Sequence, residues 1–176
     1  QNPLNAGIWV AVIYTGSSVG SILGGWISST LMKRGWPVGK ARMTAMGLAA
    51  IFMPGSILAY YTESFAMCVA FITLATACHQ AWSANLFTNA TDLFPQKVSG
   101  SVVGLGATAG GIGGMFMTLL AGLAVQWTGN QQIVFVWAGL MHVLALALFW
   151  FWFKGRFVQI DVDKPLDVSG THGGLA

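Results

Sequence analysis

Long runs without charged residues dominate the pattern of hydrophobic and polar positions along the chain. Between Lys97 and Lys154 there are 56 residues without a single Lys, Arg, Asp or Glu. A helix that crosses a bilayer needs roughly 20 consecutive apolar residues, so this run is long enough for two crossings. The polar segment 128–132 in its middle, Thr-Gly-Asn-Gln-Gln, supplies the turn between them. The pattern therefore predicts an integral membrane protein.

The same criterion, applied to the whole chain, predicts an all-α membrane protein with five membrane-spanning helices. Residues 1–153 are expected to form one transmembrane bundle, and the polar, Gly-rich segment 154–176 a disordered cytoplasmic tail. Pro54 lies inside the second span, where we expect a kink because proline cannot donate a helical hydrogen bond. The expected spans are residues 6–31, 43–61, 65–91, 100–127 and 133–153.

The composition and the positions of the charges agree with this reading. Only 7% of the residues are charged, against about 25% in soluble domains. There is no basic stripe with interleaved aromatic residues, so the net charge of +3 does not indicate nucleic-acid binding. All eight basic residues fall on one side of a five-pass arrangement, which the positive-inside rule makes cytoplasmic. They are Lys33, Arg34, Lys40 and Arg42 in the first loop, Lys97 in the third, and Lys154, Arg156 and Lys164 after the last span.

The cysteine and histidine positions do not indicate a cofactor or a metal site. Cys68 and Cys78 are ten residues apart in one span, about 15 Å along a helix, which is too far for a disulfide. His142 stands alone in the fifth span, where we expect it to be satisfied locally or to lie at the border with lipid. With this topology the chain starts outside and ends inside. An odd number of passes is expected if upstream helices precede this sequence.

Two of the predicted spans carry glycine at four-residue spacing, which places the glycines on one face of each helix. Small residues at such spacing allow a second helix to approach closely in a bilayer. Ordinary packing within one bundle explains the pattern, and so does a sliding interface with another domain. The two stripes are Gly16, Gly20 and Gly24 in the first span, and Gly106, Gly110 and Gly114 in the fourth.

The third span is the polar one. His79, Trp82 and Ser83 fall on one helical face, and Gln80 and Asn85 flank it. Polar groups at membrane depth are costly and usually face the bundle interior or a wet cavity. An aromatic ring beside imidazole, hydroxyl and amide groups suits a polyhydroxylated or carboxylated small molecule. Hydrogen bonding to neighbouring helices is the alternative explanation.

The order of the sequence motifs resembles a known family. Gly-Gly-Trp-Ile-Ser-Ser at 24–29 runs into Lys33-Arg34-Gly35 and Lys40-Ala41-Arg42. His-Gln-Ala-Trp-Ser-Ala-Asn-Leu-Phe-Thr at 79–88 leads to Asp-Leu-Phe-Pro at 92–95, then to two glycines. This order resembles the second half of a major facilitator superfamily transporter, and more closely the anion:cation symporter family with its hexuronate transporters. The resemblance covers about residues 8–153 and implies that the five spans are helices eight to twelve of twelve.

The resemblance also implies roles for residues already singled out. Helix ten of such transporters lends a polar and aromatic patch to the substrate site. The first loop matches the cytoplasmic basic motif, although its usual acidic residue is not evident and Ser28-Ser29 lie near that place. Helices eight and eleven face the other half of the protein, and nine and twelve lie at the periphery. The matching substrate positions are His79, Gln80, Trp82, Ser83 and Asn85, with Thr108 on the next helix, and the loop positions are Lys33, Arg34, Gly35, Lys40 and Arg42.

The expected function is secondary transport in the cytoplasmic membrane, not enzymatic catalysis. The expected activity is proton-coupled symport of a hexuronate or related organic anion by alternating access, with no cofactor. The coupling carboxylates and the main substrate-binding arginine are expected in the absent first half of the protein. Two alternatives stay open: a non-transporting subunit or receptor on a transporter-like fold, and a haem protein that uses His79 and His142 as ligands.

Overall fold

The computed structural model describes residues 3–153, and the expected tail lies outside the described residues. Five helical stretches within this range are long and apolar enough to cross a membrane. The second of these consists of two consecutive helices. This confirms the prediction of an all-α membrane protein with five spans. The helices are α1 (Pro3–Lys33), α2 (Val38–Phe52), α3 (Gly55–Tyr61), α4 (Phe65–Leu93), α5 (Gln96–Thr128) and α6 (Gln132–Phe153).

The second span is interrupted at Pro54, as predicted. α2 ends at Phe52 and α3 begins at Gly55. Across the break, the N–H of Ser56 donates to the Met53 carbonyl and the N–H of Ile57 to the Pro54 carbonyl, each at 3.0 Å. These bonds reach back three residues, so the backbone tightens locally where proline offers no N–H. The span is therefore interrupted at Pro54, and two backbone hydrogen bonds connect its two helices across the break.

The loop after α1 is fixed by a glycine in the left-handed conformation. Gly35 has φ = 85°, its N–H donates to the Met32 carbonyl at 2.9 Å, and the N–H of Trp36 donates to the Leu31 carbonyl at 3.2 Å. This pair of bonds is a Schellman cap, which satisfies the last carbonyls of a helix. The cap turns the chain sharply, so that the start of α2 lies beside the end of α1.

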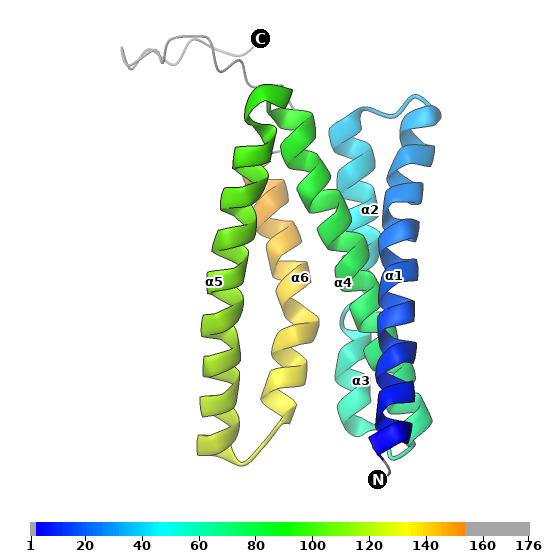
Figure 1. The fold of residues 1–176 in the computed structure, drawn as a ribbon, viewed down its shortest axis with the longest axis vertical. Coiled ribbons are helices and arrows are strands. Elements are labelled where there is room, and N and C mark those ends of the chain that lie inside the picture. The colour runs from blue at the N-terminus through cyan, green and yellow to red at the C-terminus, as the bar shows by residue number, and fades with distance from the viewer. Residues whose placement is uncertain (1–2, 154–176) are drawn as a thin grey trace.

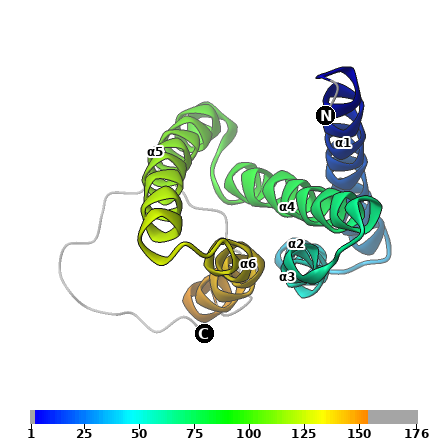
Figure 2. The same ribbon diagram turned by 90° about the horizontal axis from the view of Figure 1, so that it is seen from below.

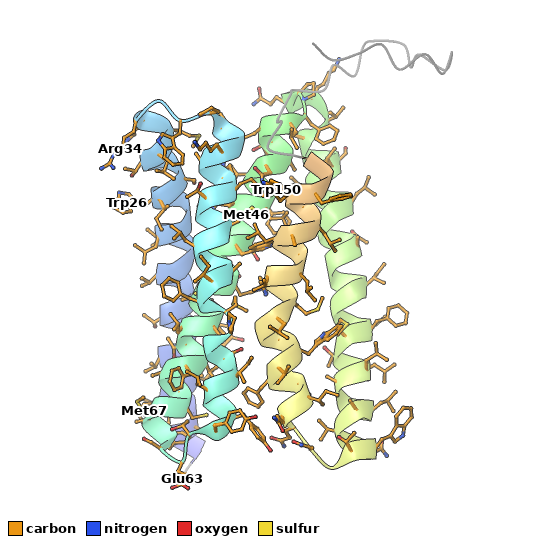
Figure 3. The ribbon with its side chains drawn as sticks, turned by 180° about the vertical axis from the view of Figure 1, so that it is seen from behind. Trp26, Arg34, Met46, Glu63, Met67 and Trp150 are labelled. Atoms are coloured by element: carbon orange, nitrogen blue, oxygen red, sulfur yellow. The ribbon has the colours of Figure 1, made fainter. Side chains whose placement is uncertain are left out.

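The helices run alternately along one axis, with α4 in the middle of the bundle (Figures 1 and 2). α4 packs most extensively against α1, which runs parallel to it, and then against α2. α6 lies beside α2 and α3, whereas α5 stands at the edge with few contacts. The first loop and the α4–α5 connection share one end of the bundle. Arg34 and Glu63 lie at opposite ends (Figure 3), which agrees with the predicted one-sided distribution of basic residues.

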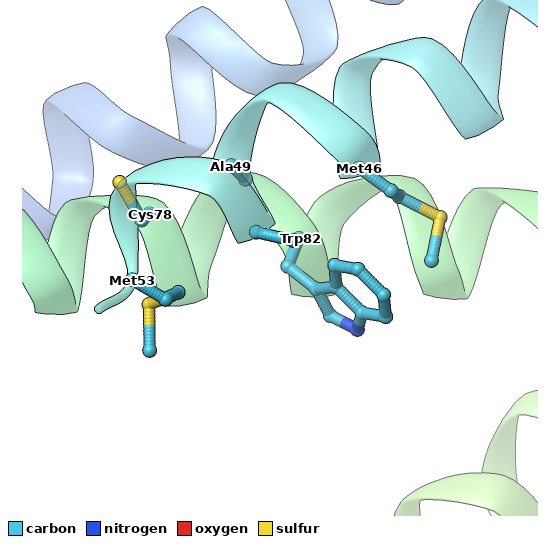
Figure 4. Close-up of a cluster of buried hydrophobic side chains, with 6 residues drawn as sticks. Met46, Ala49, Met53, Cys78 and Trp82 are labelled. Atoms are coloured by element: carbon cyan, nitrogen blue, oxygen red, sulfur yellow. The ribbon is translucent and has the colours of Figure 1, made fainter. Parts of the chain in front are cut away.

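The buried core is small and lies between α2 and α4. It consists of Met46, Ala49, Ala50, Met53, Cys78 and Trp82 (Figure 4). α5 has no buried residue, and most of the large apolar side chains of α6 are exposed. Outward-facing apolar side chains are what a bilayer requires, because lipid is as apolar as the protein core.

The two glycine stripes have different surroundings. A Cβ on Gly24 would come within 2.6 Å of the Ala81 Cα, and one on Gly20 would likewise meet the backbone of Ala77. A Cβ on Gly16 would meet the side-chain methyl of Thr73. α4 of the same bundle therefore occupies the α1 stripe, which leaves no space there for another domain. A Cβ on Gly106, Gly110 or Gly114 would have nothing within 4 Å. The α5 stripe thus forms an open surface among residues 3–153.

Candidate functional site

The polar residues of α4 point in three directions. Trp82 is only 6% exposed and belongs to the core against α2. On the α6 side, the Nδ1 of His79 lies 3.0 Å from the Nε2 of His142. The two imidazoles meet edge to face with centroids 5.2 Å apart, and Trp82 meets the His142 ring at 5.5 Å. His79 and Trp82 therefore join α4 to its neighbours.

His142 is not satisfied within its own helix, which corrects the sequence-based expectation. Its partner is 63 residues earlier in the chain. Its second nitrogen, Nδ1, is buried and has no hydrogen-bond partner among residues 3–153. A buried N–H without a partner is rarer than a buried acceptor without one, so the unpaired Nδ1 of His142 is the nitrogen without a proton. The proton is then on His142 Nε2, which donates to His79 Nδ1. Because the two rings are in direct contact, a macrocycle does not fit between them, and the haem alternative is not supported.

Asn85 ties α4 to the glycine stripe of α1. It is fully buried, and its Nδ2 donates to the Gly24 carbonyl at 3.0 Å and to the Ala81 carbonyl at 2.9 Å. One turn later, the Nδ2 of buried Asn89 lies 3.5 Å from the sulfur of Met46. Both side chains point into the bundle, so they position α4 and do not line its open face. The side-chain oxygens of both lack a partner within the described part of the chain.

Gln80 and Ser83 occupy a different face of α4. With Thr76 they follow the spacing i, i+4, i+7 of one helical stripe, whereas the core residues Cys78 and Trp82 belong to the opposite side. The side chains of Gln80 and Ser83 are half-buried. Thr76 lines a pocket of about 200 Å³ together with residues of α1 that include Tyr14. Gln80 and Ser83 are therefore the members of the predicted substrate patch that face away from the core, and Thr76, which was not predicted, extends the same stripe.

Thr108 lies on α5, the helix with the open glycine stripe. Its hydroxyl donates to the Gly104 carbonyl at 2.9 Å, and the residue is exposed. The few contacts between α4 and α5 leave Thr108 outside the packed part of the bundle. The structure therefore does not bring Thr108 into contact with the α4 residues predicted to share its site.

The basic loop motif contains one buried member, Arg42. Its Nε lies 3.0 Å from the Asp92 Oδ2, and its Nη1 donates to the Ser28 hydroxyl at 2.9 Å. Ser28 is fully buried, and its own hydroxyl donates to the carbonyls of Gly24 and Gly25. The side chains of Arg42 and Asp92 are 9% and 26% exposed. α1, α2 and α4 are thus joined at their basic end.

The acid that pairs with Arg42 therefore comes from another helix, α4. Asp92 lies 50 residues after Arg42, at the end of α4. The sequence marked it as the first residue of the Asp-Leu-Phe-Pro segment at 92–95, but not as a partner of Arg42. The remaining motif residues, Lys33, Arg34, Gly35 and Lys40, are exposed. The Nζ of Lys40 lies 4.6 Å from the centre of the Trp36 ring, a cation–π contact.

Two curated proteins of known name are similar to this chain. It is 27% identical over 145 residues to the D-galactonate transporter of Escherichia coli O6:H1. The matched region covers 82% of this chain and 32% of that protein. It is 29% identical over 170 residues to a Pseudomonas putida protein named "Probable galactarate/D-glucarate transporter GudP". This second matched region covers 96% of this chain and 36% of that protein. No protein-family model matches the chain.

The chain spans about a third of the length of the curated relatives that it matches. Both relatives are named as transporters of acid sugars, and neither is named as an enzyme. The resemblance to acid-sugar transporters of the major facilitator superfamily is confirmed, at modest identity over most of the chain.

Proposed function

We propose that this chain is part of a secondary transporter for acid sugars that works by alternating access in the cytoplasmic membrane. The observation that carries the proposal is the similarity to two acid-sugar transporters over 82% and 96% of the chain. The five spans would be helices eight to twelve, and helices one to seven would complete the protein. Aldonates, aldarates and hexuronates share one chemistry, a carboxylate on a polyhydroxylated carbon chain, and we propose this class as the substrate.

The open stripe of α4 would bind the hydroxyl groups of the substrate. Thr76, Gln80 and Ser83 offer neutral hydroxyl and amide groups, which suit sugar hydroxyls better than a carboxylate. A carboxylate calls for a charge-assisted partner such as arginine, and within residues 3–153 the buried arginine, Arg42, is already paired with Asp92. The carboxylate would therefore be bound by the other half of the protein. His79, Trp82 and Asn85 would act on the site indirectly, by holding α4 in place.

Transport would be coupled to protons and gated at the basic end of the bundle. No acidic residue lies at mid-depth in the described spans, since Asp92 is at the end of α4 and Glu63 is in a loop. The main coupling carboxylate would thus belong to the other half. The Arg42–Asp92 pair joins three helix ends, a suitable place for a contact that changes as the protein opens and closes. The positive-inside rule places this end in the cytoplasm.

Uptake into proteoliposomes that contain the complete transporter tests the proposal. The substrates compared are galactonate, galactarate, glucarate and glucuronate, each with and without an inward proton gradient. We expect saturable uptake of at least one of them, driven by the gradient and abolished by a protonophore. Absence of uptake for all four acids would overturn the assignment of substrate class, and gradient-independent uptake would overturn proton coupling alone.

Two single substitutions test the binding stripe. Gln80→Ala and Ser83→Ala should each raise KM about five-fold, the effect of losing one neutral hydrogen bond worth roughly 1 kcal/mol. Ser18→Ala is the matched control, because Ser18 is exposed on α1 and its hydroxyl donates to its own helix at the Tyr14 carbonyl. Unchanged KM in both stripe variants would refute the role of this face in binding.

A further inference from the structure

A groove runs between α2 and α6 on the side of the bundle away from α1. Its volume is about 690 Å³, and residues from both helices and from the loop before α2 line it. The groove lies on the face of the bundle shown in Figure 3, near Trp150. The residues that matter for its chemistry are Lys40, Met43, Thr44, Val143, Leu146 and Trp150.

The surface around this groove is suited to lipid. Leu144, Leu148 and Phe151 of α6 expose 53%, 71% and 69% of their surface. The groove lies on other helices than the two surfaces that we assign to substrate and to the other half of the protein. The substrate surface is the polar stripe of α4, and the surface for the other half is the open glycine stripe of α5. A hydrophobic surface of this kind at membrane depth is covered by acyl chains.

The groove is polar at one end and apolar along its floor. Lys40 lies at the polar end, and its Nζ is placed over the Trp36 ring at 4.6 Å. Among residues 3–153, Asp92 pairs with Arg42, and no carboxylate of this range forms a salt bridge with Lys40. From Trp150 down to Val143 the floor is seven residues long, about 10 Å at the rise of an α-helix. A positive charge above an apolar channel complements a molecule with an anionic head and a hydrocarbon tail.

We propose that this groove binds an anionic phospholipid. The phosphate of the headgroup pairs with the Lys40 ammonium, beside the Trp36 and Trp150 rings, which sit at the depth where aromatic side chains favour the membrane interface. One acyl chain lies along Met43, Val143 and Leu146. The bound lipid fills the seam between α2 and α6 and holds them together at their basic end. This inference does not depend on the transported substrate.

Native mass spectrometry of the complete, detergent-purified protein tests the proposal. Phosphatidylglycerol and phosphatidylcholine with identical acyl chains are the two lipid probes, and glycerol 3-phosphate is the soluble probe without a tail. We expect phosphatidylglycerol to bind more tightly than phosphatidylcholine. Lys40→Gln should weaken phosphatidylglycerol binding about five-fold, which corresponds to the roughly 1 kcal/mol that one lysine contributes near an anionic surface. Phosphatidylcholine binding should not change in this variant.

Two further variants separate the headgroup from the groove. Lys33→Gln removes an exposed charge at the end of α1, outside the groove, and should leave the binding of both lipids unchanged. Ala147→Trp fills the groove with a large side chain and should weaken both lipids. Equal effects of Lys40→Gln and Lys33→Gln would mean a diffuse surface charge and would overturn the proposal. Binding of glycerol 3-phosphate as tight as that of the lipid would also overturn it, because the acyl chain would then contribute nothing. Because the readout is lipid binding, it is independent of whether the protein transports acid sugars.

Discussion

Replacing Gly20 with alanine should push α1 away from α4, whereas the same replacement at Gly110 should leave the bundle intact. A Cβ at Gly20 would lie 2.5 Å from the Ala77 Cα and closer still to its carbonyl oxygen. These are backbone atoms of a helix, so they cannot rotate out of the way. At Gly110 nothing lies within 4 Å of the added carbon.

The expected difference in stability follows from two terms. Alanine is favoured over glycine inside a helix by about 1 kcal/mol, and this gain is common to both variants, so it cancels in their comparison. Forcing an extra carbon into a tight contact costs about 1–3 kcal/mol. The free energy of unfolding of the Gly20→Ala protein should therefore be about 1–3 kcal/mol lower than that of the Gly110→Ala protein.

Cys78 provides the assay. It is 8% exposed in the core between α2 and α4, so a thiol reagent reaches it only when the bundle opens. Modification of Cys78 is followed by mass spectrometry along a thermal ramp of the detergent-solubilised protein. Cys78 should be modified at a lower temperature in the Gly20→Ala protein than in the Gly110→Ala protein. A midpoint for Gly20→Ala equal to or above that of Gly110→Ala would refute the close packing of α1 on α4.

Substitutions at three further contacts of the bundle are tested by the same thermal assay. Asp92→Asn should destabilise the protein by about 1–3 kcal/mol, because it leaves the buried Arg42 charge without its counter-ion. Asp92→Glu keeps the charge and should destabilise the protein less. Equal destabilisation by the two variants would contradict the ion pair. Trp82→Ala should cost about 3–5 kcal/mol by leaving a cavity in the core, and a loss of transport without any loss of stability would instead indicate direct contact with substrate. A double-mutant cycle with His79→Ala and His142→Ala should give a coupling of about 0.6–1.7 kcal/mol, as for other hydrogen bonds between transmembrane helices, and additive single effects would mean that the rings do not interact.

The helices themselves could be predicted closely from the sequence. Charge-free length fixes how many times a chain crosses a bilayer, and a proline inside a span fixes where it bends, so five spans and the break at Pro54 followed directly. Three predicted ends, at residues 61, 65 and 153, coincide with helix ends, and at the other ends the helices extend beyond the predicted spans by one to five residues. For example, the second span was expected to begin at residue 43, whereas α2 begins at Val38. This difference arises because the helices continue past the apolar run into polar residues.

The contacts of the polar residues could be predicted only in part. Helical periodicity shows which side chains share a face, but it does not show which neighbour that face meets. His79, Trp82 and Ser83 were assigned to one face, yet Trp82 enters the core, His79 meets α6, and Ser83 lies on the open side. The partners of Arg42 and His142 are 50 and 63 residues away. Such pairs depend on how the helices are rotated in the bundle, which a single sequence does not encode locally.

The close packing of the α1 glycines against α4 has a consequence for the synthesis and membrane insertion of the protein. Each glycine of the α1 stripe meets a residue about 57 positions later in the chain, so the ribosome must add those residues before the contact can form. At about 5–20 residues per second, α1 waits in the membrane for roughly 3–11 s with its glycine face against lipid or the insertion machinery. During this interval any other small-residue helix nearby competes for the same face. The order of synthesis, and not only the final packing, therefore selects the partner of α1.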